Sequence, residues 1–186
     1  MMTKTLTTLF MILAIAAAAG AATQEEIEGH PGYFALEELG LFDEDGLEID
    51  VNLSGSVLRL VSGATEEGDP EFSSLMAGLK RIRVLVGRPS LDDSASIITE
   101  LNHAASRLEA DGWQSIVKIR EHDENIRLLV RDNGETIEGL TVLIGDGTDE
   151  VVLVNIVGEI DPEALGRLSG VLSGVSGVDD LNITFD

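Results

Sequence analysis

Apolar and polar residues alternate through several short segments of the chain, which is the pattern of half-buried β-strands. The strand-like segments are 47–53, 80–86, 113–121, 125–132, 137–145 and 150–158. The last four follow one another closely, separated by turn residues such as the run Asp132-Asn133-Gly134. Short connections of this kind join antiparallel neighbours. The second half of the chain therefore predicts a four-stranded meander.

A 3–4 spacing of apolar residues predicts one long helix over Ser90–Asp111. Its apolar stripe consists of Leu91, Ala95, Ile98, Leu101, Ala105 and Leu108. Ser90 is a good N-cap residue, and Gly112 fits the position that ends a helix in left-handed conformation. Shorter helical patterns lie at 57–64 and from Asp69 onward, between the first two strands.

The segment 151–160 is apolar on both faces, since Val152, Val154 and Ile156 alternate with Val151, Leu153 and Asn155. Such a strand is typical of the centre of a sheet. After it, Asp161 and Pro162 are suited to begin a helix as N-cap and first helical residue.

These elements predict an α+β fold: one mixed, largely antiparallel sheet with helices packed mainly on one face. The helical patterns between the first two strands favour a right-handed crossover, which would make that pair parallel.

The N-terminus has the layout of a secretory signal peptide. Lys4 precedes an apolar core, and small residues follow at positions 19–22. We expect cleavage before Ala22 or Thr23, and so a periplasmic or secreted protein. The expected regions are the signal peptide 1–22, an acidic arm 23–46, one domain 47–172 and a loosely held tail 173–186. The arm is expected to be exposed, with a short ordered end near Tyr33 and Phe34. The chain has no cysteine, which excludes disulfides and lipid attachment through cysteine.

Two stretches of the chain, "LRLVSGATEEGDPEFSSLMAGLKRIRVLV" and "VNIVGEIDPEALGRLS", resemble the exported bacterial proteins of domain-of-unknown-function family 4252. The likeness covers roughly residues 47–172. The resemblance implies an envelope location and an α+β domain, but no activity and no catalytic residues. Some relatives resemble lipoproteins, a property that a chain without cysteine does not share.

The composition of the chain argues against nucleic-acid binding and against a metal site. The net charge is −22, so the chain as a whole repels nucleic acid, and the aromatic content of 4% offers no stacking platform. The three histidines, His30, His103 and His122, lack the spacing of metal ligands. The acidic run Asp43–Asp50 lacks the ligand order of a calcium loop. We therefore expect no metal, no cofactor and no nucleic-acid partner.

Half of the twelve cationic side chains fall at alternate positions of three predicted strands. They are Arg81, Arg83, Lys118, Arg120, Arg127 and Arg131, and the alternation places them on one face of the sheet. Pairing with acids such as Glu48 and Asp50 across the strands is the simpler interpretation. The functional interpretation is a docking face for an acidic protein, including a second copy of this chain.

The sequence thus predicts a non-enzymatic exported binding or regulatory protein of the bacterial cell envelope. One alternative is a carboxylate- or metal-dependent hydrolase that uses Glu159 and Asp161, although each of these also has a structural role at the end of a strand. A second alternative is a structural component that associates with itself.

Overall fold

The computed structural model describes residues 22–43, 45–55, 57–60, 76–91, 94–121, 124–145 and 150–160. The first 21 residues, the predicted helix after Asp161 and the tail from residue 173 fall outside this part of the chain.

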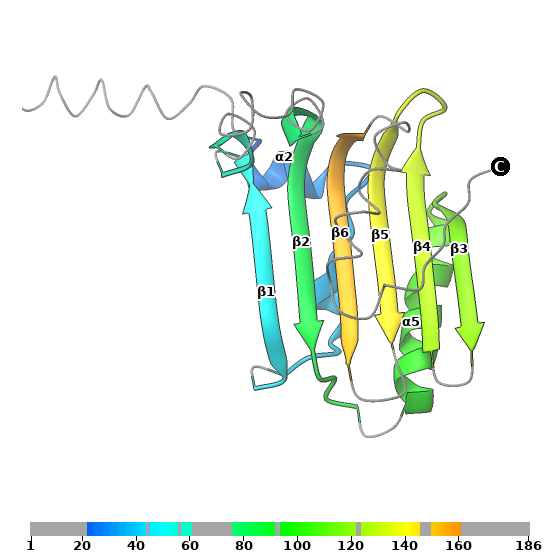
Figure 1. The fold of residues 1–186 in the computed structure, drawn as a ribbon. Coiled ribbons are helices and arrows are strands. Elements are labelled where there is room, and N and C mark those ends of the chain that lie inside the picture. Colours follow the sequence, from blue (N-terminus) through cyan, green and yellow to red (C-terminus); the bar gives the residue numbers. More distant parts are fainter. Residues whose placement is uncertain are drawn as a thin grey trace, which may run out of the picture.

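The centre of the molecule is one six-stranded sheet, which confirms the α+β class (Figure 1). The strands are β1 (Leu47–Ser54), β2 (Leu79–Gly87), β3 (Gln114–Glu121), β4 (Glu124–Asp132), β5 (Ile137–Gly145) and β6 (Val151–Ile160). They lie in the order β1-β2-β6-β5-β4-β3, and every neighbouring pair is antiparallel. The predicted meander is therefore confirmed, and β6 is a central strand, as its two apolar faces indicate.

The predicted parallel pairing of the first two strands is wrong. Ser54 at the end of β1 lies opposite Arg81 near the start of β2. The chain between them therefore leaves and re-enters the sheet at the same end. A parallel pair would need a connection that runs the full length of a strand to return to the opposite end.

The helix α5 (Ser94–Ala110) lies across β3, β4 and β5 on one face of the sheet (Figure 1). It begins four residues later than predicted, and Ser90 instead donates both its backbone N–H and its Oγ to the carbonyl of Leu41. Its end is as predicted, with Gly112 at φ 88°. A left-handed residue at this point costs least as glycine.

The sheet separates two apolar clusters, one on each face. The first cluster joins α5 residues such as Leu101 and Leu108 to Leu143 and Leu153 of the sheet. The second contains Val142, Val154 and Ile156, which point the other way. Both faces of β5 and β6 are thus buried, as their nearly continuous apolar sequence requires.

The acidic arm is not exposed as predicted, because it packs onto the sheet face that carries α5. It contains α2 (Gln24–Glu28) and the 3₁₀ helix η1 (Leu36–Leu39). Ile27, Leu36 and Leu41 are each at most 2% exposed. These few apolar side chains anchor a segment whose composition is otherwise acidic.

The prediction that the helices pack mainly on one face is not confirmed. η1 and α5 share the first cluster. Helical residues between β1 and β2 contribute Leu58 and Met76 to the second, on the opposite face. Among the described residues, no helix combines the length and the apolar character of a membrane span.

The arm and the sheet touch backbone to backbone where Gly32 crosses Gly139 of β5. A side chain at position 139 would collide with the Cα, carbonyl carbon and oxygen of Gly32. We expect Gly139→Ala to lower the free energy of unfolding by about 1–3 kcal/mol, as overpacked sites do. Urea unfolding measures this loss.

Gly40→Ala is the matched control for this prediction. Gly40 has φ 59° but nothing within 4 Å of the position of a Cβ, so alanine there costs only the left-handed conformation, about 1 kcal/mol. A Gly139→Ala variant as stable as the wild type would contradict the close approach.

Candidate functional site

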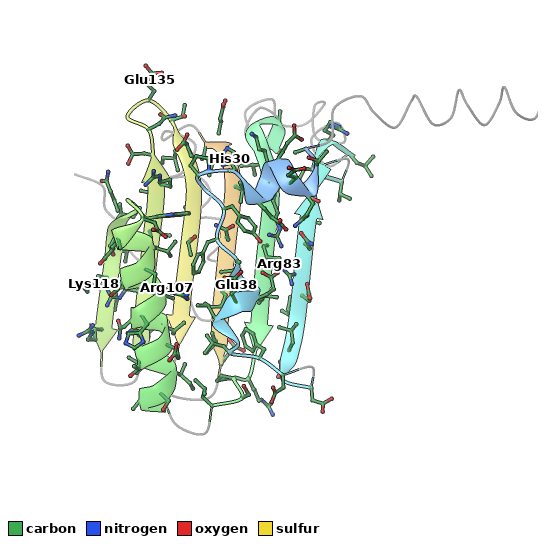
Figure 2. All side chains as sticks on the ribbon, turned by 180° about the vertical axis from the view of Figure 1, so that it is seen from behind. His30, Glu38, Arg83, Arg107, Lys118 and Glu135 are labelled. Atoms are coloured by element: carbon green, nitrogen blue, oxygen red, sulfur yellow. The ribbon has the colours of Figure 1, made fainter. Side chains whose placement is uncertain are left out.

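The six predicted site cations do lie on one face of the sheet. Register places Arg83 level with Asn155 of β6, and Arg127 directly opposite Lys118. Arg81 and Arg131 are level with each other through Val157 and Gly139, on the strands between them. This is the face that η1 and α5 cover, so it is not an open face (Figure 2).

Arg81 and Arg83 of β2 form the polar centre under the arm. Their side chains are 5% and 8% exposed, and both guanidinium groups bind Glu37 of η1. Arg83 also binds the carboxylate of Asp50, and Arg81 donates through Nε to Asn52 Oδ1 at 3.1 Å. Asp50 and Asn52 lie on β1, so the cluster joins the edge strand, β2 and the arm. These two cations therefore have the internal partners that the simpler interpretation expects.

Asn155 of β6 holds the arm next to this cluster. It is fully buried, and its Oδ1 accepts a hydrogen bond from the backbone N–H of Phe34 at 3.2 Å. Its Nδ2 donates to the carbonyl of Gly32 at 3.1 Å and to Thr141 Oγ1 at 3.1 Å. The ring of Tyr33 lies 5.5 Å from the guanidinium carbon of Arg81, within cation–π range.

The acids of this cluster are held ionised. Burial alone would raise the pKa of Glu37, but the hydrogen bond from Arg83 and the charges of Arg83 and Arg81 outweigh it, so the pKa is lowered. The hydrogen bond from Arg83 lowers the pKa of Asp50. The same bond, against burial, raises the pKa of Arg83. The cluster therefore carries permanent charge at neutral pH.

The other cations have no acidic partner of this kind. Arg127 is 4% exposed and donates to Asn102 Oδ1 on α5 at 2.5 Å. Arg131 donates to the backbone carbonyl of Asp111 at the end of α5. The four ion pairs of the described residues involve Arg81, Arg83 and Arg88, and none involves these side chains.

The two cations on β3 are the most exposed of the set, and Arg131 on β4 is half-buried. Lys118 and Arg120 are exposed, and β3 is the edge strand beyond α5. Figure 2 shows Lys118 at this outer edge, on the far side of α5 from Arg83. Docking over all six cations, as the functional interpretation proposed, is therefore not possible: Arg81, Arg83 and Arg127 are buried beneath other elements.

A shallow groove of about 570 Å³ runs between η1 and α5. Glu38 and Leu39 line one side, and residues of α5 such as His103 and Arg107 line the other. Figure 2 shows Glu38 and Arg107 facing each other across it. The groove is open and carries both signs of charge, and it encloses no catalytic group from the sheet.

Among the remaining candidates, the structure describes His30, His103 and Glu159. His30 accepts a hydrogen bond at Nδ1 from the backbone N–H of Gly32 at 3.2 Å, and burial lowers its pKa. Glu159 is exposed on β6, whereas Asp161 and His122 lie outside the described residues. Within the described part of the chain, no three His, Cys, Asp or Glu residues converge as a metal site would require.

Sequence reasoning did not identify Glu37, Asn102 and Asn155. Each is polar and lies next to apolar residues, but residues of this kind are common on solvated surfaces. The one available signal was Asn155, which is a single amide in the apolar run of β6. A buried amide in a central strand must find hydrogen-bond partners.

Comparison with known families gives one match. The profile of the family described as Domain of unknown function (DUF4252) matches residues 42–168. No curated protein and no solved structure matches the chain. The match starts within the arm, just before the first strand of the sheet.

The charge cluster predicts a dependence of stability on pH. Because the pKa of Glu37 is lower in the folded state, its contribution to stability is present above its ordinary value of 4.5 and is lost as the pH falls through the folded value. We expect Glu37→Gln to cost about 2 kcal/mol at pH 7. This is less than a fully buried pair, since the Glu37 side chain is 45% exposed.

Urea unfolding at several pH values tests this prediction. The wild type and Glu37→Gln should become equally stable at acid pH, where Glu37 is protonated. Glu38→Gln, on the same turn of η1, makes the same change of charge without an ion pair to Arg81 or Arg83. A Glu37→Gln variant that follows this control at all pH values would exclude the proposed role of the ion pair.

Proposed function

We propose, on the premise that the chain belongs to the DUF4252 family, that it is an exported, non-enzymatic binding protein of the bacterial cell envelope. Its binding surface is the cationic edge, defined as Lys118 and Arg120 on β3 with Arg127 behind them on β4. Its partner is an acidic protein, bound through an extended acidic segment.

One observation carries this proposal. The cationic edge has no carboxylate within ion-pair distance among the described residues, whereas Arg81 and Arg83 each form an ion pair with Glu37 and Arg83 a second one with Asp50. Cations are scarce in a chain of net charge −22, so three grouped without acids offer a strong contrast to the rest of the surface. Charge of this kind steers an acidic partner to one place and makes binding depend on salt.

The position of these residues on an edge strand supports an extended partner. The outer side of β3 has no neighbouring strand among the described residues, so its backbone N–H and C=O groups are available for pairing. Ile116 is 41% exposed at the irregularity between Ser115 and Val117, and it adds an apolar contact beside the cations.

The alternatives of a carboxylate- or metal-dependent hydrolase and of a self-associating component remain predictions. Among the described residues, Glu159 belongs to no group of three His, Cys, Asp or Glu residues that could hold a metal. Self-association is a special case of the same surface, in which the acidic segment belongs to a second copy.

Export is the first part of the proposal to test. Expression of the full chain in a Gram-negative host should place the protein in the periplasmic fraction. Its mass should correspond to a chain that begins at Ala22 or Thr23. Replacing apolar residues of the segment 9–19 by lysine should leave the uncleaved protein in the cytoplasm. A protein that stays cytoplasmic with its N-terminus intact would exclude export.

Charge reversal tests the binding surface. We expect the wild-type protein to bind a fluorescent decaglutamate peptide at low salt and to release it at high salt. Lys118→Glu/Arg120→Glu should weaken binding at least tenfold, as measured by fluorescence anisotropy. The control Arg59→Glu/Arg88→Glu makes the same change in net charge at exposed sites elsewhere and should bind as the wild type does.

The same proteins, tested against envelope extract, show whether a natural partner uses this edge. A partner retained equally by the wild type and the Lys118→Glu/Arg120→Glu variant would place its binding site elsewhere. Light scattering at the two salt concentrations identifies the case in which the partner is a second copy.

A further inference from the structure

The corner where α5 crosses β3 and β4 has more hydrogen-bond donors than acceptors. Asn102 Oδ1 accepts a hydrogen bond from Arg127 Nη2 at 2.5 Å. It also accepts hydrogen bonds from Arg120 Nη2 and Asn125 Nδ2, at 3.4 Å each. A carbonyl oxygen has two lone pairs, so three donors exceed what this one atom can satisfy. Two of the three donors belong to cations.

One donor behind this oxygen is buried and has no acceptor. Arg127 is 4% exposed, yet its Nε has no hydrogen-bond partner. The neighbouring Asn125 is fully buried, and its acceptor Oδ1 is also without a partner. A buried donor without an acceptor costs about 1–3 kcal/mol, more for a charged group. Such a group in a native fold is a reason to look for a missing acceptor.

Negative charge is also missing here. Register sets Lys118 opposite Arg127 on the same face. The next acids along β3 and β4 that the structure describes, Glu121 and Glu124, lie opposite each other on the other face. Burial and then the charge of Arg120 lower the pKa of Arg127, and Glu109 only partly opposes them from beyond ion-pair distance. The described residues thus place three cations together and neutralise none of them.

We infer that this corner is a carboxylate-binding site, in which the guanidinium groups of Arg120 and Arg127 hold an Asp or Glu side chain of the partner. The inference rests on the proposed function, and it names the group of the acidic partner that anchors it. Lys118 and Arg120 are exposed and Asn102 is half-buried, so the corner is accessible from the solvent beside the β3 edge.

The shape of the corner favours a carboxylate over a phosphate. The acceptor already in place is the planar amide of Asn102, and a carboxylate is planar, has nearly the same size and offers twice the number of acceptor oxygens. Its two oxygens can accept from both guanidinium groups, and hydrogen bonds between ionised partners are about twice as strong as neutral ones. This arrangement would relieve both the excess of donors and the uncompensated charge.

Asn102→Asp tests the site, because it gives the chain a carboxylate of its own beside the guanidinium groups that we expect to hold the ligand. We expect the variant to be more thermostable than the wild type at low salt. In the wild type, we expect sodium acetate to raise the Tm above its value in sodium chloride of equal ionic strength. In Asn102→Asp, we expect acetate and chloride to give the same Tm. At ten times its dissociation constant, acetate should raise the wild-type Tm by about 3–6 °C. Asn133→Asp, which adds the same charge in an exposed turn, should respond to acetate as the wild type does.

Decaglutamate separates this inference from the proposed function. We expect the wild type and Asn133→Asp to bind the peptide equally, and Asn102→Asp to bind at least tenfold more weakly. Equal binding by all three proteins would overturn the carboxylate site and leave the cationic edge as the binding surface. If acetate raises the Tm of the wild type and of Asn133→Asp alone, and neither protein binds the peptide, the carboxylate site is supported and the proposal of an acidic partner is overturned.

Inorganic phosphate completes the experiment. Stronger protection by phosphate than by acetate would overturn the assignment to a carboxylate. Equal effects of acetate and chloride on the wild type, together with a lower Tm for Asn102→Asp, would overturn the site altogether.

Discussion

The arrangement of this molecule depends on two guanidinium groups buried on one face of a sheet. Arg81 and Arg83 point from β2 into a face that is otherwise apolar around Leu85 and Leu153. A charge in such a place must be paired and hydrogen-bonded, or the fold loses several kcal/mol. Glu37 supplies the pairing, and it can do so only if the arm lies across the sheet.

The rest of the arm follows from this constraint. Asn155 binds the backbone of Phe34 and Gly32 a few residues before Glu37, and Gly139 allows the two backbones to approach. Leu36 and Leu41 then complete the apolar cluster beneath α5. A segment with an acidic composition thus becomes part of the core, because its carboxylate is required there.

The same residue type has two different roles on this one face. Arg81 and Arg83 bind carboxylates of the chain itself, so they stabilise the position of the arm. Arg127 and Arg120 lie three and four strands away, and the acceptor that they share among the described residues is the amide oxygen of Asn102. The difference lies in what packs above each group: η1 carries an acid over β2, whereas α5 carries a neutral amide over β4. We therefore assign structure to the first pair and binding to the second.

The strands, the long helix, the central place of β6 and the common face of the six cations could all be predicted from the sequence. Each of these follows from the period of side chains along a strand or helix, which is a local property. The parallel pairing of β1 and β2 was predicted wrongly, since the path of their connection is not a local property. Which of these cations are buried depends on which elements pack over them, and this is a property of the tertiary structure. The partners Glu37 and Asn102 are 46 and 25 residues away from Arg83 and Arg127, and no periodicity relates such distant positions.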